Sequence, residues 1–179
     1  MAADLSLIDP KLRDLLSKLL AKCSAEGFEM RPSSGLRVPV EQGKLWRQSR
    51  SSEEIAAKIS EFRAKGANFL ADCIEKAGPQ HGDHVTDAPP GYSWHQWGEA
   101  VDCFWLLDGK AEWSTTRLIN GRNAYKVYAS EAAALGLNAG GNWKTFKDWP
   151  HVQLRADRNP ETKLDIVAID RGMKVRFGK

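Results

Sequence analysis

Two histidines and two aspartates in this 179-residue sequence have the residue types and spacing of a catalytic metal site. His95 and Asp102 lie seven residues apart, and Asp148 precedes His151 by three. Zinc binds imidazole nitrogen and carboxylate oxygen at about 2.0–2.2 Å, and a catalytic zinc site combines three protein ligands with one open position. The spacing predicts a zinc site held by His95, Asp102 and His151. The residue types alone leave an ordinary His–Asp pair open as the alternative.

Gly98, between His95 and Asp102, is the feature that lets these two residues share one ion. In a straight strand, residues seven apart point to opposite faces of the sheet. In a helix they share a face but lie about 10 Å apart along the axis. Glycine can adopt a backbone conformation that reverses the chain. We therefore expect a bend at Gly98 that brings Asp102, at the start of a strand, beneath His95.

Asp148 is the predicted general base. Pro150 restricts Trp149 to an extended conformation, so the segment from Asp148 to His151 is expected to be a turn. A carboxylate three residues before a metal ligand, across such a turn, can reach the water that a metal activates. Glu99, which lies in the predicted bend, is an alternative base. The helical HExxH motif of other zinc peptidases is absent from the sequence.

Helices and short strands follow one another around these residues without a βαβ rhythm. Helices are expected over residues 10–26, 39–48, 52–77, 123–135 and 159–169, and strands over residues 28–31, 100–107, 111–113 and 151–154. The last helix is expected to bury Leu164, Val167 and Ala168. This order predicts a single α+β domain over residues 1–179, with a small antiparallel sheet flanked by helices.

The motif residues resemble a known family of enzymes. Ser93-x-His95-x-x-Gly98-x-Ala100-x-Asp102, followed by Asp148-x-x-His151, is similar to the signature of D-Ala-D-Ala carboxypeptidases and L-alanyl-D-glutamate endopeptidases, which have the hedgehog/DD-peptidase fold. The upstream stretch Ser34-Gly35-Leu36-Arg37, followed by Gln42, Leu45 and Arg50, also resembles that family. The resemblance covers residues 30–155 in matching order. It departs at residues 52–80, a helical insert where many relatives are shorter.

The resemblance implies a role for each site residue. The ligands of zinc would be His95, Asp102 and His151. Asp148 would activate water, where many relatives carry glutamate. Arg37 would stabilise the substrate carbonyl or the oxyanion, and two further side chains would contact the substrate, Ser93 and Gln42.

Several of the neighbouring side chains have ordinary structural alternatives. Arg37 could instead form a surface ion pair. Four tryptophans could line a groove, but core packing is the expected role: Trp94, Trp97, Trp143 and Trp149. The three cysteines show no CxxC pairing and are expected to be buried free thiols: Cys23, Cys73 and Cys103. Cys103 follows Asp102 in a strand, so its side chain should point to the opposite face.

Charge and hydropathy bear on where the protein acts. The net charge of +3 comes entirely from residues 155–179, which hold seven Lys or Arg against four Asp or Glu. Such a segment favours anionic partners such as wall polymers or lipid headgroups, with a solvated helix as the alternative. No apolar run reaches 18 residues, and no secretory signal pattern is visible at the N-terminus. We expect a monomer made in the host cytoplasm, with no stable membrane insertion and no nucleic-acid partner, which reaches the cell wall after membrane breach.

These observations and the resemblance predict a zinc-dependent peptidoglycan peptidase. The resemblance favours an L-alanyl-D-glutamate endopeptidase that acts as a phage endolysin in host cell lysis. One alternative is a D-Ala-D-Ala carboxypeptidase of wall recycling, and another is a zinc-stabilised wall-binding module without turnover. A binding module needs metal ligands but no base, so Asp148 distinguishes it from an enzyme.

Overall fold

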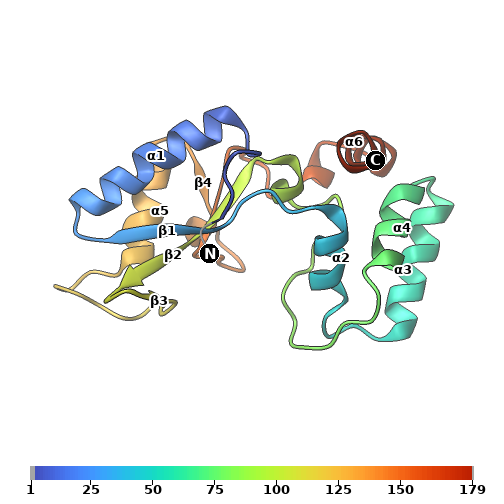
Figure 1. The fold of residues 1–179 in the computed structure, drawn as a ribbon, viewed down its shortest axis with the longest axis horizontal. Coiled ribbons are helices and arrows are strands. Elements are labelled where there is room, and N and C mark those ends of the chain that lie inside the picture. The colour runs from blue at the N-terminus through green and yellow to red at the C-terminus, as the bar shows by residue number, and fades with distance from the viewer. Residues whose placement is uncertain (1–2, 179) are drawn as a thin grey trace. The chain divides into compact units, whose positions relative to one another are not determined.

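The computed structural model describes residues 3–178, and these residues divide into two compact units. Unit 1 contains the described residues up to Leu36 together with Trp97–Ala156. Unit 2 contains Arg37–Gln96 and the chain from Asp157 onward. Each unit has its own buried core, and Figure 1 shows the helices and strands of both.

Unit 1 is a small antiparallel sheet with two helices. Its helices are α1 (Pro10–Ala25) and α5 (Ala124–Ala134), and its strands are β1 (Glu29–Ser34), β2 (Ala100–Leu107), β3 (Lys110–Glu112), β4 (Asn138–Ala139) and β5 (His151–Gln153). The strands lie in the order β1-β2-β5-β4, and β3 pairs with β2 through a hairpin at Asp108-Gly109. A short 3-10 helix, η2 (Gly140–Asn142), follows β4.

The core of unit 1 lies between one face of this sheet and the two helices. Strand β2 contributes three fully buried residues at alternate positions, Val101, Cys103 and Trp105, and β5 contributes Val152. Because successive strand residues point to opposite faces, the intervening residue Asp102 lies on the other face of the sheet. The core side chains of β2 and the Asp102 carboxylate therefore lie on opposite faces of the sheet.

Unit 2 is helical. It contains α2 (Pro39–Arg47), α3 (Ser52–Ala64), α4 (Asn68–Lys76), the 3-10 helix η3 (Pro160–Thr162) and α6 (Ile166–Phe177). Its buried side chains include Trp46, Phe62, Leu70, Ile74, Ile169 and Met173. Helix α4 has no side-chain cap of its own, and the buried Asp170 of α6 accepts a hydrogen bond of 2.9 Å from the backbone N–H of Leu70 in its first turn. This bond joins α6 to α4.

Most predicted elements are present, and three of the helices have side-chain N-caps: Asp9 caps α1, Ser51 caps α3 and Asn123 caps α5. The single helix predicted over residues 52–77 is wrong, because Gly66 adopts φ +78 and separates α3 from α4. The helix predicted over residues 159–169 is also wrong. Residues Pro160–Thr162 form the separate η3, and Asp165 caps α6 by accepting from the N–H of Ala168.

The burial of α6 differs from the prediction as well. Val167 is 51% exposed, whereas Ile169 and Met173 are the apolar residues that α6 buries completely. The strand predicted over residues 28–31 extends further than expected, because β1 continues through Pro32 to Ser34. This continuation follows from the edge position of β1, where a proline nitrogen needs no partner in the sheet.

The α+β fold class is confirmed, and the three cysteines are free and buried as predicted. No helix within residues 3–178 is long and apolar enough to span a membrane. The assignment of residues 1–179 to a single domain stays a prediction.

Candidate metal centre

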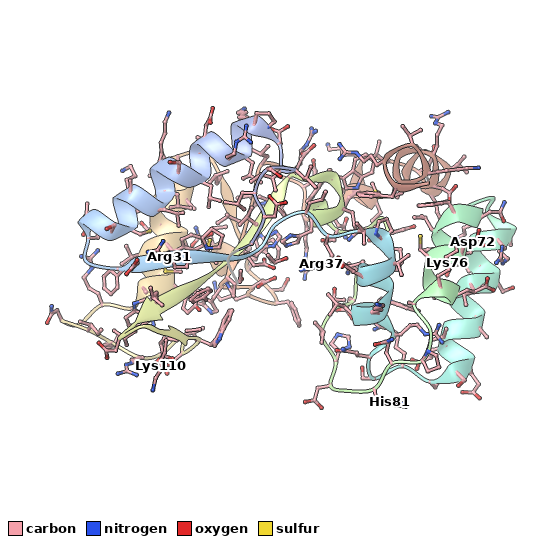
Figure 2. All side chains as sticks on the ribbon, in the orientation of Figure 1. Arg31, Arg37, Asp72, Lys76, His81 and Lys110 are labelled. Carbon is pink, nitrogen blue, oxygen red and sulfur yellow. The ribbon has the colours of Figure 1, made fainter. Side chains whose placement is uncertain are left out.

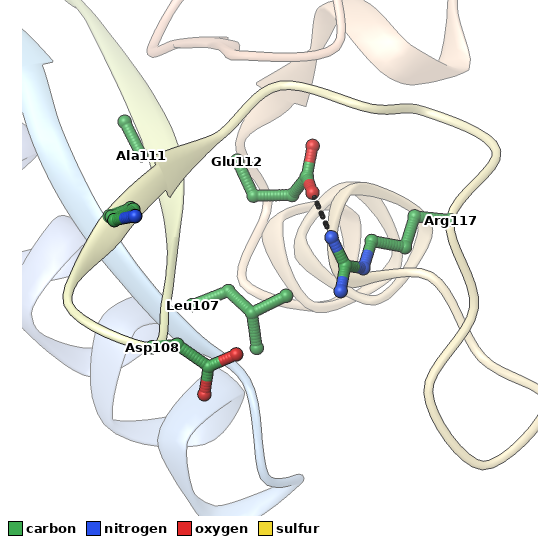
Figure 3. A pocket seen from close by; sticks show the side chains of 6 residues that line it. Leu107, Asp108, Ala111, Glu112 and Arg117 are labelled. Carbon is green, nitrogen blue, oxygen red and sulfur yellow. Dashed lines mark hydrogen bonds and ion pairs between the residues drawn. The ribbon is translucent and has the colours of Figure 1, made fainter.

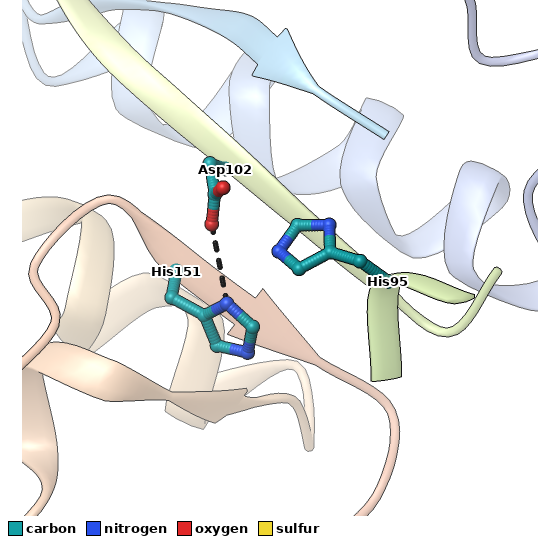
Figure 4. A group of neighbouring side chains, drawn as sticks. All are labelled: His95, Asp102 and His151. Atoms are coloured by element: carbon teal, nitrogen blue, oxygen red, sulfur yellow. Dashed lines mark hydrogen bonds and ion pairs between the residues drawn. The ribbon is translucent and has the colours of Figure 1, made fainter. Parts of the chain in front are cut away.

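The structure brings the three predicted ligands together (Figure 4). One ligand atom from each of His95, Asp102 and His151 lies within 4.8 Å of the others. His95 and His151 are buried and Asp102 is half-buried. Nδ1 of His151 lies 3.1 Å from Oδ1 of Asp102, close to the roughly 3.3 Å expected between two ligands of a tetrahedral zinc with bonds of about 2.0 Å. Two imidazoles and a carboxylate at this spacing fit a zinc ion.

The predicted bend at Gly98 is present. His95 lies in a short 3-10 helix, η1 (Trp94–Trp97), and β2 begins two residues after Gly98. Gly98 adopts φ +73, a conformation that favours glycine. Its carbonyl accepts a hydrogen bond of 2.8 Å from Asp9 N–H, and a Cβ at this position would lie 3.2 Å from the carbonyl oxygen of Leu7. The bend is thus held against the chain before α1, where a side chain would be in tight contact with backbone atoms.

Asp102 and His151 meet because β2 and β5 are antiparallel with these two residues directly opposite each other. Paired residues on adjacent antiparallel strands carry their side chains on the same face. Burial disfavours the charged form of His151, but Asp102, Asp148 and the hydrogen bond with Gln153 favour it, and the net effect is a raised pKa of the imidazole. The negative charge beside His151 therefore favours a cation at this place.

Asp148 lies in the predicted turn before His151. The N–H of His151 donates to the carbonyl of Asp148 at 3.2 Å, and the N–H of Asp148 donates to the carbonyl of Gly140 at 3.2 Å. A Cβ on Gly140 would collide with the Asp148 carbonyl, and one on Gly141 would lie 2.6 Å from the Trp149 ring. The two glycines allow the turn to pack closely, and its carboxylate is near enough to influence the pKa of His151. Its role as a base stays a prediction.

Arg37 and Gln42 form a connected group in unit 2. Arg37 lies just before α2 (Figure 2), and its backbone N–H donates to the carbonyl of His95 at 3.3 Å. Its guanidinium donates to Oε1 of Gln42 at 3.0 Å. Gln42 also accepts from Nε2 of Gln96 and donates to the carbonyl of Ala88. Arg37 is half-buried, which leaves its role in oxyanion stabilisation a prediction.

Gln42 itself is 0% exposed, and both ends of its amide are bonded within the protein. In this structure the amide of Gln42 holds the guanidinium of Arg37 by a hydrogen bond and has no accessible surface, and its predicted contact with a substrate stays a prediction. Ser93 is half-buried and its Oγ accepts from the N–H of His95 at 3.4 Å. Ser93 stays a predicted substrate contact.

Glu99, the alternative base, is part of an ion pair with Arg155. Its two carboxylate oxygens accept from Nε and from a terminal nitrogen of that guanidinium, the latter at 2.9 Å. The backbone carbonyl of Glu99 also accepts from the N–H of Leu154. This pairing ties the bend to the chain after β5, which indicates a structural role for Glu99.

The tryptophans near the motif differ in their surroundings. Trp94 is buried and its indole N–H donates to the carbonyl of Asp157. Trp149 packs against the core of unit 1, as predicted. The Trp143 ring lies 5.4 Å from the His151 ring, centroid to centroid, and covers one side of this ligand.

Gln153 is a site residue that the sequence analysis missed. It lies two residues after His151 in β5 and is 1% exposed, and its Oε1 lies 2.9 Å from Nε2 of His151. The signal was available, because residues i and i+2 of a strand share a face. A glutamine two positions after a predicted ligand can therefore reach its ring.

One cavity in unit 1 lies away from these residues. It has a volume of about 300 Å³ and lies at the β2–β3 hairpin, lined by Leu107, Asp108, Lys110, Ala111, Glu112 and Arg117 (Figure 3). Arg117 and Glu112 form an ion pair of 2.7 Å within it. None of the predicted site residues lines this cavity.

Comparison with known proteins finds relatives over most of the chain. Residues 6–139 match the VanY family, described as D-alanyl-D-alanine carboxypeptidase. The peptidoglycan L-alanyl-D-glutamate endopeptidase CwlK of Bacillus subtilis (strain 168) is 25% identical over 150 residues, which cover 82% of this chain and 73% of CwlK.

Two solved structures also match. The L-Ala D-Glu endopeptidase ChiX of Serratia marcescens is 19% identical, covers 84% of this chain and 83% of its own, and gives a TM-score of 0.44. The vancomycin-resistance D,D-pentapeptidase VanY of a VanB-type cassette, solved with Zn(II), is 21% identical, covers 82% of this chain and 71% of its own, and gives a TM-score of 0.46.

Proposed function

The chain belongs to the VanY D-alanyl-D-alanine carboxypeptidase family, and from this premise we propose that it is a zinc-dependent peptidoglycan peptidase that hydrolyses the L-alanyl–D-glutamate bond of the stem peptide. The observation that carries the proposal is the meeting of His95, Asp102 and His151 within 4.8 Å. The choice of bond is supported by CwlK, which matches over 82% of this chain. The family description favours a second candidate, cleavage of the D-alanyl–D-alanine bond.

The residues of the site divide the chemistry among them. His95, Asp102 and His151 would hold a zinc ion, which would supply Lewis acidity to polarise a peptide carbonyl and to make water easier to deprotonate. Asp148 takes the proton from the attacking water and returns it to the leaving amine. Arg37 donates hydrogen bonds to the oxygen on which negative charge develops.

Asp148 and Arg37 are also what separates an enzyme from a binding module. A module that only holds the wall needs the three metal ligands and the fold around them. It has no use for a carboxylate beside the ligand set, in a turn that two glycines allow to pack closely. The position of Asp148 therefore supports turnover.

Mass spectrometry of purified peptidoglycan after incubation with the enzyme tests the proposal. L-alanyl–D-glutamate cleavage releases peptides that begin with D-glutamate and leaves L-alanine on the glycan. A D-alanyl–D-alanine carboxypeptidase releases only D-alanine and leaves the stem on the glycan. A zinc-loaded enzyme that releases neither product while cosedimenting with the wall would identify a binding module. Wild-type activity after complete removal of metal would refute the zinc mechanism.

We propose further that this activity serves as a phage endolysin, made in the host cytoplasm and acting on the wall after membrane breach. The support is a basic surface on α6, where Arg171 and Lys174 are exposed and all the excess charge of the chain lies in residues 155–179. Such a surface is attracted to anionic wall polymers, and the attraction weakens with salt.

The surface is tested by charge reversal, since Met173 between these residues is buried and a deletion would damage the core of unit 2. The double variant Arg171→Glu, Lys174→Glu should cleave soluble muropeptides at the wild-type rate but lyse permeabilised cells more slowly at low salt. If the variant lysed permeabilised cells as fast as the wild type at low salt, the role of α6 would be refuted.

A further inference from the structure

The two ring nitrogens of His151 have different partners, and this difference carries a further inference. Nδ1 lies 3.1 Å from Oδ1 of Asp102, and Nε2 lies 2.9 Å from Oε1 of Gln153. Both His151 and Gln153 are buried, at 6% and 1% exposure. Which nitrogen carries the proton decides which one can bind a metal, because a metal needs the unprotonated nitrogen.

The orientation of the Gln153 amide is fixed by a second bond. Its Nε2 donates to the backbone carbonyl of Arg155 at 2.7 Å. A backbone carbonyl only accepts hydrogen bonds, so the amide NH₂ must face Arg155 and the amide oxygen must face His151. The acceptor at Gln153 then requires a proton on Nε2 of His151. In a neutral imidazole, this leaves the lone pair on Nδ1.

Arg155 is held in place at both its backbone carbonyl and its side chain. Nδ2 of Asn138 donates to it at 3.1 Å. The guanidinium of Arg155 is paired with Glu99, and the N–H of Leu154 donates to the carbonyl of Glu99. A series of bonds therefore runs from the bend through Arg155 and Gln153 to the His151 ring.

The opposite side of the ring shows why the tautomer matters. With the proton on Nε2, Nδ1 and the Asp102 carboxylate both present lone pairs, 3.1 Å apart, and two acceptors cannot hydrogen-bond to each other. A cation bound to both atoms would remove the repulsion between these two lone pairs. With the proton on Nδ1 instead, Nδ1 would donate to Asp102, and the metal would lose this nitrogen as a ligand.

We propose that Gln153 is a positioning residue that holds His151 in the Nε2–H tautomer and thereby assigns Nδ1 as its metal-binding atom. The inference rests on the metal centre proposed above. Gln153 does not touch the substrate or the metal, and acts only through His151. Outer partners of metal-binding histidines typically change metal affinity about 10–100-fold when removed.

The test compares zinc dissociation constants, measured by competition with a chelator, in four full-length proteins. Gln153→Met removes the acceptor at similar length and should weaken zinc binding about 10–100-fold. Gln153→Glu keeps an acceptor facing Nε2 and should stay within a few-fold of wild type. Val152→Ala is the matched control: it alters the same strand on its core face, where Val152 is 0% exposed, and should lower the melting temperature without changing the dissociation constant.

A spectroscopic measurement accompanies the affinities. Long-range ¹H–¹⁵N correlation spectra of the zinc-loaded wild type should show His151 with a protonated Nε2 and a metal-bound Nδ1. A metal-bound Nε2 would overturn the inference, and so would wild-type zinc affinity in the Gln153→Met variant. Failure of the wild type to bind zinc would instead overturn the proposed function, so the two failures are distinguishable.

Discussion

Replacement of Gly98 by alanine tests the link between the backbone bend and the metal centre. Gly98 lies between His95 and Asp102 and adopts φ +73. A Cβ there would lie 3.2 Å from the Leu7 carbonyl oxygen and 3.4 Å from Cα of Ile8. Both contacts are with backbone, which cannot rotate away as a flexible side chain can. Gly98→Ala should therefore displace the bend as well as strain it.

The structure provides a control that separates these two effects. Gly109, in the β2–β3 hairpin, has the same φ of +73, but a Cβ there meets nothing within 4 Å. Gly109→Ala should cost only the left-handed backbone penalty, about 1–2 kcal/mol. Gly98→Ala should cost about 1–3 kcal/mol more, the range for forcing extra atoms into a packed region. In a chain of this length each 1 kcal/mol lowers the melting temperature by about 2–4 °C.

The Gly98→Ala substitution should also weaken metal binding. The bend determines how closely His95 approaches the Asp102–His151 pair, and zinc requires its ligands at about 2.0–2.2 Å. We expect Gly98→Ala to weaken zinc binding at least about tenfold, which corresponds to about 1.4 kcal/mol. Gly109→Ala should bind zinc like the wild type.

Thermal unfolding of the metal-free proteins gives the stability differences, and chelator competition gives the zinc affinities. Equal melting temperatures for Gly98→Ala and Gly109→Ala would show that the Leu7 contact costs nothing. Wild-type zinc affinity in Gly98→Ala would refute the reasoning that this bend positions His95.

Two further substitutions and one measurement of thiol reactivity have defined outcomes. Asp148→Asn should keep its zinc, because only the proton acceptor is lost, but peptide hydrolysis should fall about 10²-fold or more; loss of zinc in this variant would make Asp148 a ligand. Arg37→Ala should keep zinc and lower turnover about 10²–10³-fold, the range for loss of one oxyanion donor, and wild-type kinetics would make Arg37 a structural residue. Burial raises the pKa of the three thiols to about 11 or 12, so Ellman's reagent should react slowly with the native protein at pH 8 and modify all three after unfolding: Cys23, Cys73 and Cys103. A rapidly reacting thiol in the native protein would contradict their burial.

The ligand set could be predicted from sequence because its geometry depends on local features. The spacing of His95 and Asp102 excludes a regular helix or strand, and Gly98 marks the bend that remains. Pro150 marks the turn before His151 in the same way. In each case the residue type restricts the backbone directly. The residues alone still leave an ordinary His–Asp pair open, and it is the resemblance to a known family that favours the metal site.

The helical region of residues 52–77 was mispredicted because hydrophobic periodicity does not show where a helix reverses. Ile55 and Phe62 are buried in α3, and Leu70 and Ile74 are buried in α4, so apolar residues continue through the break. Only the left-handed conformation of Gly66 separates the two helices. A glycine within an apolar pattern is compatible with a helix at a cost of about 1 kcal/mol. The presence of Gly66 therefore does not distinguish one long helix from two shorter ones.

The roles of two buried glutamines also could not be predicted from the sequence. Gln42 and Gln153 are almost completely buried, and each uses both ends of its amide within the protein. The family resemblance predicts a substrate contact for Gln42 and assigns no role to Gln153. The distinction between a residue that contacts substrate and one that positions another side chain depends on burial, which only the tertiary structure shows.

Strand β2 explains why the site and the core depend on each other. Asp102 lies between Val101 and Cys103, which are both fully buried in the core of unit 1. A one-residue slip of β2 against β5 would move Asp102 toward the core and break its pairing with His151. The slip is strongly disfavoured, because it would bury a carboxylate and expose two apolar side chains. Hydrophobic packing on one face of β2 thereby fixes the register that brings the carboxylate and the imidazole together on the other.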